Sequence, residues 1–253
     1  MLKVLKNRII IAGWHAVRTS IVLAPELCIR VWLDKKNTQK FSLELERQLQ
    51  LLNLRIEHVE KSTLKKICGN DRHQGVVLER RVPAQINFTA FIENVIEAKN
   101  ADDLLFLILD RIQDPRNFGA CLRTADCVGA TAVIYPSNNN VGLTSVAAQA
   151  AAGAIDCLPL LRVSNLSQAM RALKSKGVQL IGTDSSAAQS IYEVDLCAPT
   201  AIVVGNEGVG LRNLTKSLCN KVVSLPVIGT IPSLNVSAAT SVFLYEVLRQ
   251  RIS

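Results

Sequence analysis

The chain has 253 residues, enough for one large domain or two modest ones with a buried core. Its apolar content of 49% and charged content of 20% are ordinary for a globular protein. No apolar run reaches the ~18–20 residues of a membrane span, and the basic N-terminus lacks an apolar secretory segment followed by a cleavage site. We therefore expect neither a membrane-spanning nor a secreted protein, and no membrane partner.

The positive charge is concentrated at the beginning of the chain. Residues 1–100 hold 17 Lys/Arg and 10 Asp/Glu, whereas residues 101–253 hold 12 and 11, so balances of +7 and +1 make up the net +8. A basic N-terminal part favours a polyanionic partner such as nucleic acid. A lysine-rich surface that serves only solubility would give the same balance.

Cysteine and histidine usage argues against a disulfide framework and against a metal site. The seven cysteines are odd in number, scattered, and nowhere spaced as C-x-x-C. This pattern is typical of reduced thiols in a cytoplasmic protein. With only three histidines in the chain, we predict that no metal is bound.

Residues 8–82 alternate short strand-like and helical segments and predict a compact α/β domain over residues 1–82. A linker is expected over 83–100, with one helix at Phe88–Lys99. Within the domain, strands are expected at Arg8–Ala12, Cys28–Leu33, Ile56–Val59 and Gln74–Leu78, and helices at His15–Ala24, Phe41–Asn53 and Ser62–Cys68, the last with Ser62 as its N-cap.

From residue 101 onward, short apolar runs alternate with helical stretches, which indicates a mostly parallel sheet covered on both faces. The expected strands are Leu104–Leu109, Ala132–Tyr135, Ala154–Leu160, Val178–Gly182, Ala201–Val204 and Val222–Leu225. The expected helices are Ala120–Val128, Thr144–Ala152, Leu166–Lys176, Leu211–Cys219 and Ser237–Arg251.

The first candidate motif runs from Asp110 to Arg123, where a buried strand gives way to a loop and a helix. If the helix begins near Gly119, Arg123 lies one turn into it and its guanidinium can reach back to the sheet edge. The alternative is structural: Asn117 caps the helix and Arg123 pairs with Asp114 or Asp126.

The second motif, Gly205-Asn-Glu-Gly-Val-Gly210, follows the strand at Ala201–Val204. Its glycines let the backbone approach a ligand closely. It differs from the dinucleotide fingerprint, which would need a glycine at Asn213, and from a P-loop, because no Gly-Lys-Ser/Thr follows. A glycine-rich turn with Glu207 as a solvated charge is the alternative.

The third motif, Ser233-Leu-Asn-Val-Ser237, precedes the last helix. Ser233 or Asn235 could cap that helix, and backbone amides at a helix start can also hold an anion or an adenine edge. All three motifs lie where strands end, which is where open α/β sheets build their sites.

In this order, the three motifs resemble those of the SPOUT class of RNA methyltransferases, in particular its SpoU branch, which methylates ribose 2′-hydroxyls. The resemblance covers about residues 105–251. It implies an α/β sheet threaded into a trefoil knot over residues 101–253, and a homodimer with the site near the subunit interface. It also implies S-adenosylmethionine as the methyl donor, bound by Gly205, Leu225 and Leu234.

By the same resemblance, Arg123 activates the hydroxyl, while Asn117, Glu207, Ser233 and Asn235 orient Arg123, a phosphate and the ribose. An arginine is an unusual base, because a guanidinium keeps its proton up to a pH of about 12. Either Arg123 is transiently deprotonated with help from a substrate phosphate, or it stays charged and stabilises the developing alkoxide.

The N-terminal part resembles the ribosomal-protein-like RNA-binding domain that precedes the knotted domain in enzymes acting on large-subunit rRNA. We therefore expect a cytoplasmic rRNA-processing enzyme that methylates a ribose, in a guanosine, of 23S rRNA. Two alternatives stay open: a tRNA ribose 2′-O-methyltransferase of the same fold, and a non-catalytic RNA-binding assembly protein.

Overall fold

The computed structural model describes residues 7–36, 47, 49–98 and 103–252. The chain divides into two compact units. The first consists of Met1–Ala84 together with Leu143–Cys157, and the second of Gln85–Gly142 together with Leu158–Ser253.

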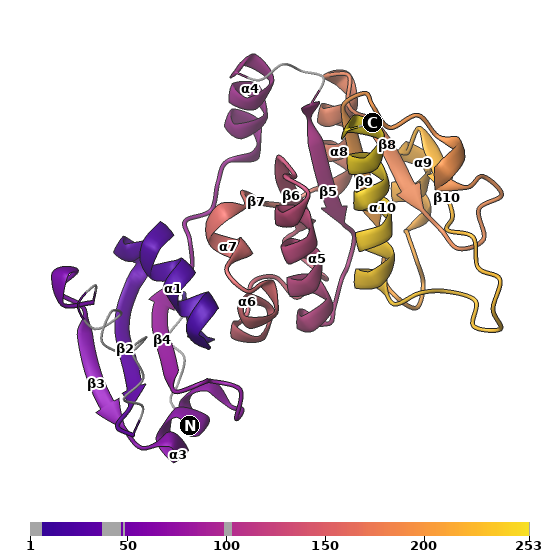
Figure 1. Ribbon diagram of the computed structural model, residues 1–253. Helices are drawn as coiled ribbons and strands as arrows, with labels where there is room; N and C mark the ends of the chain where they lie inside the picture. Colours follow the sequence, from indigo (N-terminus) through magenta and orange to yellow (C-terminus); the bar gives the residue numbers. More distant parts are fainter. Residues whose placement is uncertain (1–6, 37–46, 48, 99–102, 253) are drawn as a thin grey trace. The chain divides into compact units, whose positions relative to one another are not determined.

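The first unit is built on a four-stranded sheet with the strand order β1-β4-β2-β3. Figure 1 shows β4, β2 and β3 of this sheet side by side. The strands β2 and β3 are parallel, and the other neighbours are antiparallel. Its elements are β1 (Arg8–Ala12), α1 (Trp14–Leu23), the 3₁₀ turn η1 (Pro25–Leu27), β2 (Cys28–Asp34), β3 (Arg55–Val59), α3 (Lys61–Cys68), β4 (Val76–Arg81), α6 (Ser145–Ala151) and α7 (Ala154–Cys157).

The strands and helices expected within residues 8–82 are present, except that one N-cap differs and most of one expected helix lies outside the described residues. The N-cap of α3 is Glu60 rather than Ser62, because the helix begins at Lys61. Of the helix expected at Phe41–Asn53, residues 47 and 49–51 are helical, while 41–46 and 48 lie outside the described residues.

The segment Leu143–Cys157 joins the first unit through buried polar contacts. Arg80 of β4 and Asp156 of α7 form an ion pair with both side chains fully buried. The hydroxyl of Ser20 in α1 accepts from Arg80 at 2.9 Å and donates to Asp156 at 2.7 Å. The backbone N–H of Ile10 in β1 donates to the Ser145 hydroxyl of α6 at 2.9 Å. These bonds satisfy groups that would otherwise be buried without partners.

The second unit contains a six-stranded parallel sheet with the order β10-β8-β9-β5-β6-β7. Its strands are β5 (Leu105–Leu109), β6 (Ala132–Pro136), β7 (Leu160–Val163), β8 (Gln179–Thr183), β9 (Thr200–Val204) and β10 (Lys221–Val223). Its helices are α4 (Phe88–Ala98), α5 (Pro115–Cys127), α8 (Leu166–Ser175), the 3₁₀ turn η3 (Ile191–Glu193), α9 (Asn213–Leu218) and α10 (Val236–Ile252).

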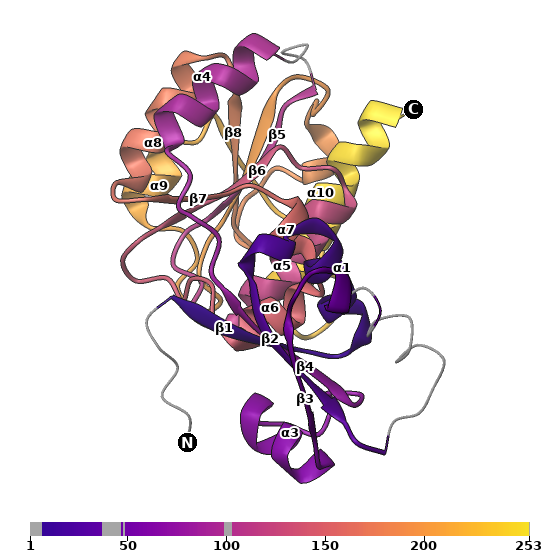
Figure 2. The ribbon, with the colours of Figure 1, turned by 90° about the vertical axis from the view of Figure 1, so that its left-hand side faces the viewer.

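Helices cover both faces of this sheet. Figure 2 shows α4, α8 and α9 on one face and α5 and α10 on the other. The strand residues are almost all buried, and α8 contributes Met170 and Leu173 to the core on its side. The predicted α/β class with a mostly parallel, doubly covered sheet is therefore confirmed.

One predicted strand in this part of the chain is wrong. Ala154–Leu160 does not form a strand: Ala154–Cys157 is the short helix α7, and the strand β7 begins only at Leu160. The apolar side chains of Ala154 and Ile155 are buried in a helical turn instead. A short apolar run cannot by itself distinguish a buried strand from a buried helix.

Candidate functional site

The candidate site lies at the carboxyl ends of β5, β9, β8 and β10, which all point to one edge of the parallel sheet. After β5 the chain enters α5, after β9 it forms the glycine-rich loop, and after β10 it leads to α10. The three sequence motifs therefore leave the same edge of the sheet.

The helix α5 begins earlier than the sequence suggested. Asp114 is its N-cap and accepts from the backbone N–H of Arg116 at 2.7 Å, while Pro115 occupies the first helical position. Asn117 therefore lies inside the first turn and is not the cap. Arg123 lies about two turns into the helix rather than one.

Arg123 is exposed on α5. Among the residues that the structure describes, it forms no ion pair, so the expected alternative pairings with Asp114 and Asp126 are not seen. Its guanidinium is free to meet a group from outside the chain.

The glycine-rich loop after β9 closes on itself. The backbone of Asn206 pairs with that of Gly210 through N–O distances of 3.2 and 2.9 Å. The Asn206 side chain accepts from Gly208 N at 2.9 Å and donates to Arg111 O at 3.1 Å. A Cβ on Gly205 would lie 2.3 Å from the backbone carbon of Gly210 and 2.4 Å from the nitrogen of Leu211, so only glycine fits there.

Asn235 joins the third motif to the first. Its Oδ1 accepts from the backbone N–H of Ser237 at 2.9 Å, so it caps α10 as one alternative predicted. Its Nδ2 donates to Asn117 Oδ1 at 3.2 Å, and Asn117 Nδ2 donates to Glu207 Oε1. The hydroxyl of Ser237 donates to Asn235 Oδ1 at 2.7 Å and lies 3.5 Å from Asn117 Oδ1.

These bonds link side chains that are far apart in the sequence into one relay, from Asn235 through Asn117 to Glu207. The capping interpretation of Asn235 and the site interpretation are thus both compatible with the structure. The structure rules out the interpretation of Glu207 as a purely solvated charge, because Asn117 donates a hydrogen bond to its carboxylate.

A pocket of about 320 Å³ lies beside this relay. Gly205, Glu207, Leu225, Ser233 and Leu234 are among the residues that line it. Asn117, Arg123 and Asn235 are not among them. The three residues expected to bind the donor therefore share one pocket, and the relay reaches that pocket through Glu207. Pockets of this size hold small organic ligands.

Asp184, just after β8, lines the same pocket and is ion-paired with Lys216. Its carboxylate accepts from Lys216 Nζ at 2.6 Å, and from the N–H and hydroxyl of Ser186 at 2.8 and 2.7 Å. The hydrogen bond from Lys216, followed by those from Ser186, lowers the pKa of Asp184 to about 2. Asp184 is therefore ionised at neutral pH.

Two kinds of structure are not found in the described parts of the chain. There, no group of three or more His, Cys, Asp or Glu side chains is placed to hold a metal ion. The helices of residues 7–36, 47, 49–98 and 103–252 are also too short or too polar for one of them to cross a membrane.

Comparison with known families decides the assignment. The model of the SpoU rRNA Methylase family matches residues 104–245 of the chain. The chain belongs to the SpoU methylase family. A second model, described as RNA 2′-O ribose methyltransferase substrate binding, matches residues 10–83.

Individual SpoU relatives match nearly the whole chain. A Haemophilus influenzae protein described as 23S rRNA (guanosine-2′-O-)-methyltransferase RlmB is 39% identical over 243 residues, which cover 96% of this chain and 98% of that protein. A crystal structure described as an RNA 2′-O ribose methyltransferase superposes with a TM-score of 0.82 at 27% identity, covering 98% and 90% of the two chains.

A more distant SpoU structure, AviRb from Streptomyces viridochromogenes in complex with the cofactor AdoMet, has a TM-score of 0.79 at 24% identity. It covers 98% of this chain and 91% of that chain. At this identity the likeness shows the shared fold.

Three residues of this SpoU site were not among the sequence candidates. The Asn206 side chain bonds to the backbone of Arg111 and Gly208, the Ser237 hydroxyl donates to Asn235, and Asp184 lines the pocket. Asn206 and Ser237 lie inside the motifs, so their polar side chains were a usable signal. Asp184 directly follows an apolar strand, as the first two motifs do. That position was the only sequence feature that could have marked it as a site residue.

Proposed function

We propose that the chain transfers a methyl group from S-adenosylmethionine to the 2′-hydroxyl of a guanosine ribose in 23S rRNA. The observation that carries this proposal is the relay of Asn235, Asn117 and Glu207 beside the pocket. It joins three segments that each follow a different strand of the sheet. The SpoU family and the relatives described as 23S rRNA guanosine methyltransferases support the reaction and the substrate.

The residues of the pocket fit the methyl donor. The backbone of Gly205 approaches that of Gly210 so closely that no side chain separates them, which leaves a cradle of main-chain groups. Gly205, Leu225 and Leu234 would hold S-adenosylmethionine, with Leu225 and Leu234 as apolar walls. When bound, the donor supplies an electrophilic methyl group on a positively charged sulfur. Glu207 gives the pocket an acidic side chain, which suits a cationic ligand, whereas the charge of Asp184 is already balanced by Lys216.

The remaining side chains would position and polarise the acceptor. Arg123 is exposed and forms no ion pair within the described residues, so its guanidinium can bind a backbone phosphate or a developing alkoxide. We propose that it acts electrostatically on the acceptor, because a guanidinium keeps its proton up to a pH of about 12. Asn117, Glu207 and Asn235 would hold the ribose so that its 2′-hydroxyl lies in line with the methyl–sulfur bond of the donor. Ser233, which lines the pocket, would also contact the ribose.

We further propose residues 1–82 as the RNA substrate-binding domain, residues 83–100 as a linker, and residues 101–253 as a trefoil-knotted catalytic domain. The basic balance of the first hundred residues and the substrate-binding family match at residues 10–83 support the RNA-binding role. The knot rests on the resemblance to the SPOUT class.

A homodimer is part of the proposal. Apolar side chains stand exposed in the two loops that contribute to the pocket, and burying them against a second copy would remove them from water. They are Val209, Val227, Ile228, Ile231 and Leu234.

We propose a cytoplasmic location because the cysteines have the character of reduced thiols. Within the described residues, six of the cysteines form no disulfide: Cys28, Cys68, Cys121, Cys127, Cys197 and Cys219. Burial raises the pKa of Cys28 and Cys219 to about 11 and that of Cys121 to about 12, which keeps these thiols protonated and unreactive.

The test is transfer of label from radioactive S-adenosylmethionine to unmodified total RNA, followed by separation of rRNA and tRNA. Label in large-subunit rRNA that survives alkaline hydrolysis within a dinucleotide is expected, because a methylated 2′-hydroxyl cannot attack the adjacent phosphate. Label in tRNA would overturn the substrate and keep the mechanism. Failure to bind the donor, with no label in any RNA or pre-ribosomal particle, would favour the non-catalytic alternative.

A further inference from the structure

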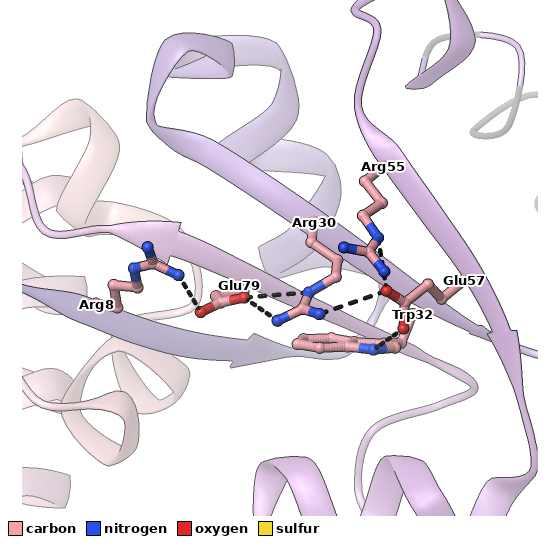
Figure 3. Close-up of polar contacts among 6 residues, drawn as sticks. All are labelled: Arg8, Arg30, Trp32, Arg55, Glu57 and Glu79. Atoms are coloured by element: carbon pink, nitrogen blue, oxygen red, sulfur yellow. Dashed lines mark hydrogen bonds and ion pairs between the residues drawn. The ribbon is translucent and has the colours of Figure 1, made fainter. Parts of the chain in front are cut away.

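A row of alternating charges crosses all four strands of the first unit (Figure 3). Glu79 of β4 pairs with Arg8 of β1 at 2.9 Å and with Arg30 of β2 at 2.7 Å. Glu57 of β3 pairs with Arg30 at 3.4 Å and with Arg55 of the same strand at 2.8 Å. Three arginines thus alternate with two glutamates, so the row keeps one net positive charge.

Arg30 differs from the other two arginines because it also rests on an aromatic ring. Its guanidinium carbon lies 4.4 Å from the centroid of the Trp32 ring (Figure 3). The ring is held in turn, since Trp32 is only 4% exposed and its Nε1 donates to Glu57 Oε2 at 3.0 Å. The guanidinium is therefore supported from below by a side chain that cannot easily move.

The edges of the same guanidinium are also fixed. Nε and Nη2 of Arg30 donate to Glu79 at 3.2 and 2.7 Å, and Nη1 donates to Glu57 at 3.4 Å. The hydrogen bond to Glu79 raises the pKa of Arg30, so the group stays charged. The indole takes one face of the guanidinium and the carboxylates take its edges, so the outer face is the one that these partners leave open; 24% of the Arg30 side chain is accessible.

Such a group is poorly suited to clamp a phosphate with two parallel hydrogen bonds, because three of its five N–H donors, including the Nε–Nη2 edge, already bond to carboxylates. It is well suited to stack against a flat, electron-rich ring, and unpaired RNA bases stack on guanidinium planes in this way. We propose that the outer face of Arg30, held by Trp32, Glu79 and Glu57, is a stacking platform for an unpaired base of the RNA substrate. This rests on the proposed function, in which the first unit binds RNA.

The row offers matched controls for a test on the full-length protein. Arg30→Lys, Arg8→Lys and Arg55→Lys each keep the charge and an amine for the glutamates, but only the first removes a plane that lies on an aromatic ring. Binding of a short fluorescent single-stranded RNA and of an RNA duplex of the same length is measured by anisotropy over a range of salt concentrations.

For Arg30→Lys we expect single-strand affinity to fall by about fivefold or more, the lower end of the loss for one stacked base. The salt dependence and the duplex affinity should stay unchanged, since the charge is kept. Arg8→Lys and Arg55→Lys should change single-strand affinity by less than about twofold. Equal losses in all three variants, or an equal loss on duplex, would overturn the platform and leave a purely structural row.

A measurement on the unaltered protein guards against misfolding of the variant. The Nε–Hε proton of Arg30 should shift in the NMR spectrum when single-stranded RNA is added, because a stacked base adds a ring current. No shift at saturating RNA would contradict the proposal. Methyl transfer to rRNA by the unaltered protein is recorded in parallel, so failure of the proposed function is seen separately from failure of the platform.

Discussion

Replacing Gly205 by alanine tests the backbone cradle of the pocket directly. The added Cβ would lie 2.3, 2.4 and 2.5 Å from three main-chain atoms of Gly210 and Leu211. None of these atoms belongs to a flexible side chain that could turn away. The loop from Asn206 to Gly210 must therefore shift as a whole, and with it Glu207.

The magnitude follows from the kind of clash. Overpacking a well-packed site costs about 1–3 kcal/mol. For a chain of this size, that corresponds to a fall in Tm of roughly 2–12 °C. If the loop relaxes by moving into the pocket, binding of S-adenosylmethionine must reverse that movement. A cost of about 1–3 kcal/mol then lowers the affinity for S-adenosylmethionine by roughly 5- to 150-fold.

Thermal unfolding and calorimetric binding of S-adenosylmethionine measure both effects. Gly208→Ala is the matched control in the same loop, because its Cβ would meet only Asn206 Oδ1 at 3.6 Å, an ordinary contact. We expect the control to retain Tm; its donor affinity is not used as a reference, because Gly208 also lines the pocket. If Gly205→Ala bound the donor as tightly as the unaltered protein and unfolded at the same temperature, the cradle argument would be refuted.

Three further predictions concern charged side chains. Arg123→Ala should abolish methyl transfer while donor binding and Tm are retained, since the side chain is exposed; loss of the fold in circular dichroism would count against a catalytic role. Asp184→Asn should lower Tm at neutral pH, and this deficit should vanish in acid, because the stabilisation by Lys216 is complete above the ordinary pKa of 3.8 and is lost as pH falls towards about 2. A pH-independent deficit would contradict this. Asp156→Ala should cost about 3–5 kcal/mol in denaturant unfolding, because it leaves the buried guanidinium of Arg80 without its anion; a cost below about 1 kcal/mol would show that the pair is unimportant.

Periodicity predicted the sheet of the second unit because its strands are buried on both faces. Runs such as Leu104–Leu109 and Ala201–Val204 are apolar throughout, and both are strands. The run at Ala154–Leu160 looks the same but is divided between α7 and β7. In the structure, Asp156 of α7 pairs with Arg80, which is distant in the sequence. No local pattern contains that information.

The start of α5 was misjudged for a different reason. The dipeptide Asp114-Pro115 is a helix-start signal in its own right, but the glycine at 119 suggested a later beginning. In the site, the motifs indicated which segments would meet at the sheet edge. They could not indicate that Asn117 would bridge Asn235 and Glu207, because side-chain pairing depends on how the helices α5 and α10 pack.

The buried pairing of Arg80 with Asp156 also bears on the order in which the protein can be completed during synthesis. Arg80 is made early, whereas its partner leaves the ribosome after another 76 residues have been added. Until then, a nascent first unit must keep a guanidinium solvated at a position that is later dry. A fragment ending at residue 84 would remain permanently in that incomplete state. Expression of this unit on its own should therefore require Leu143–Cys157 to be supplied, either by a connecting loop or as a separate peptide.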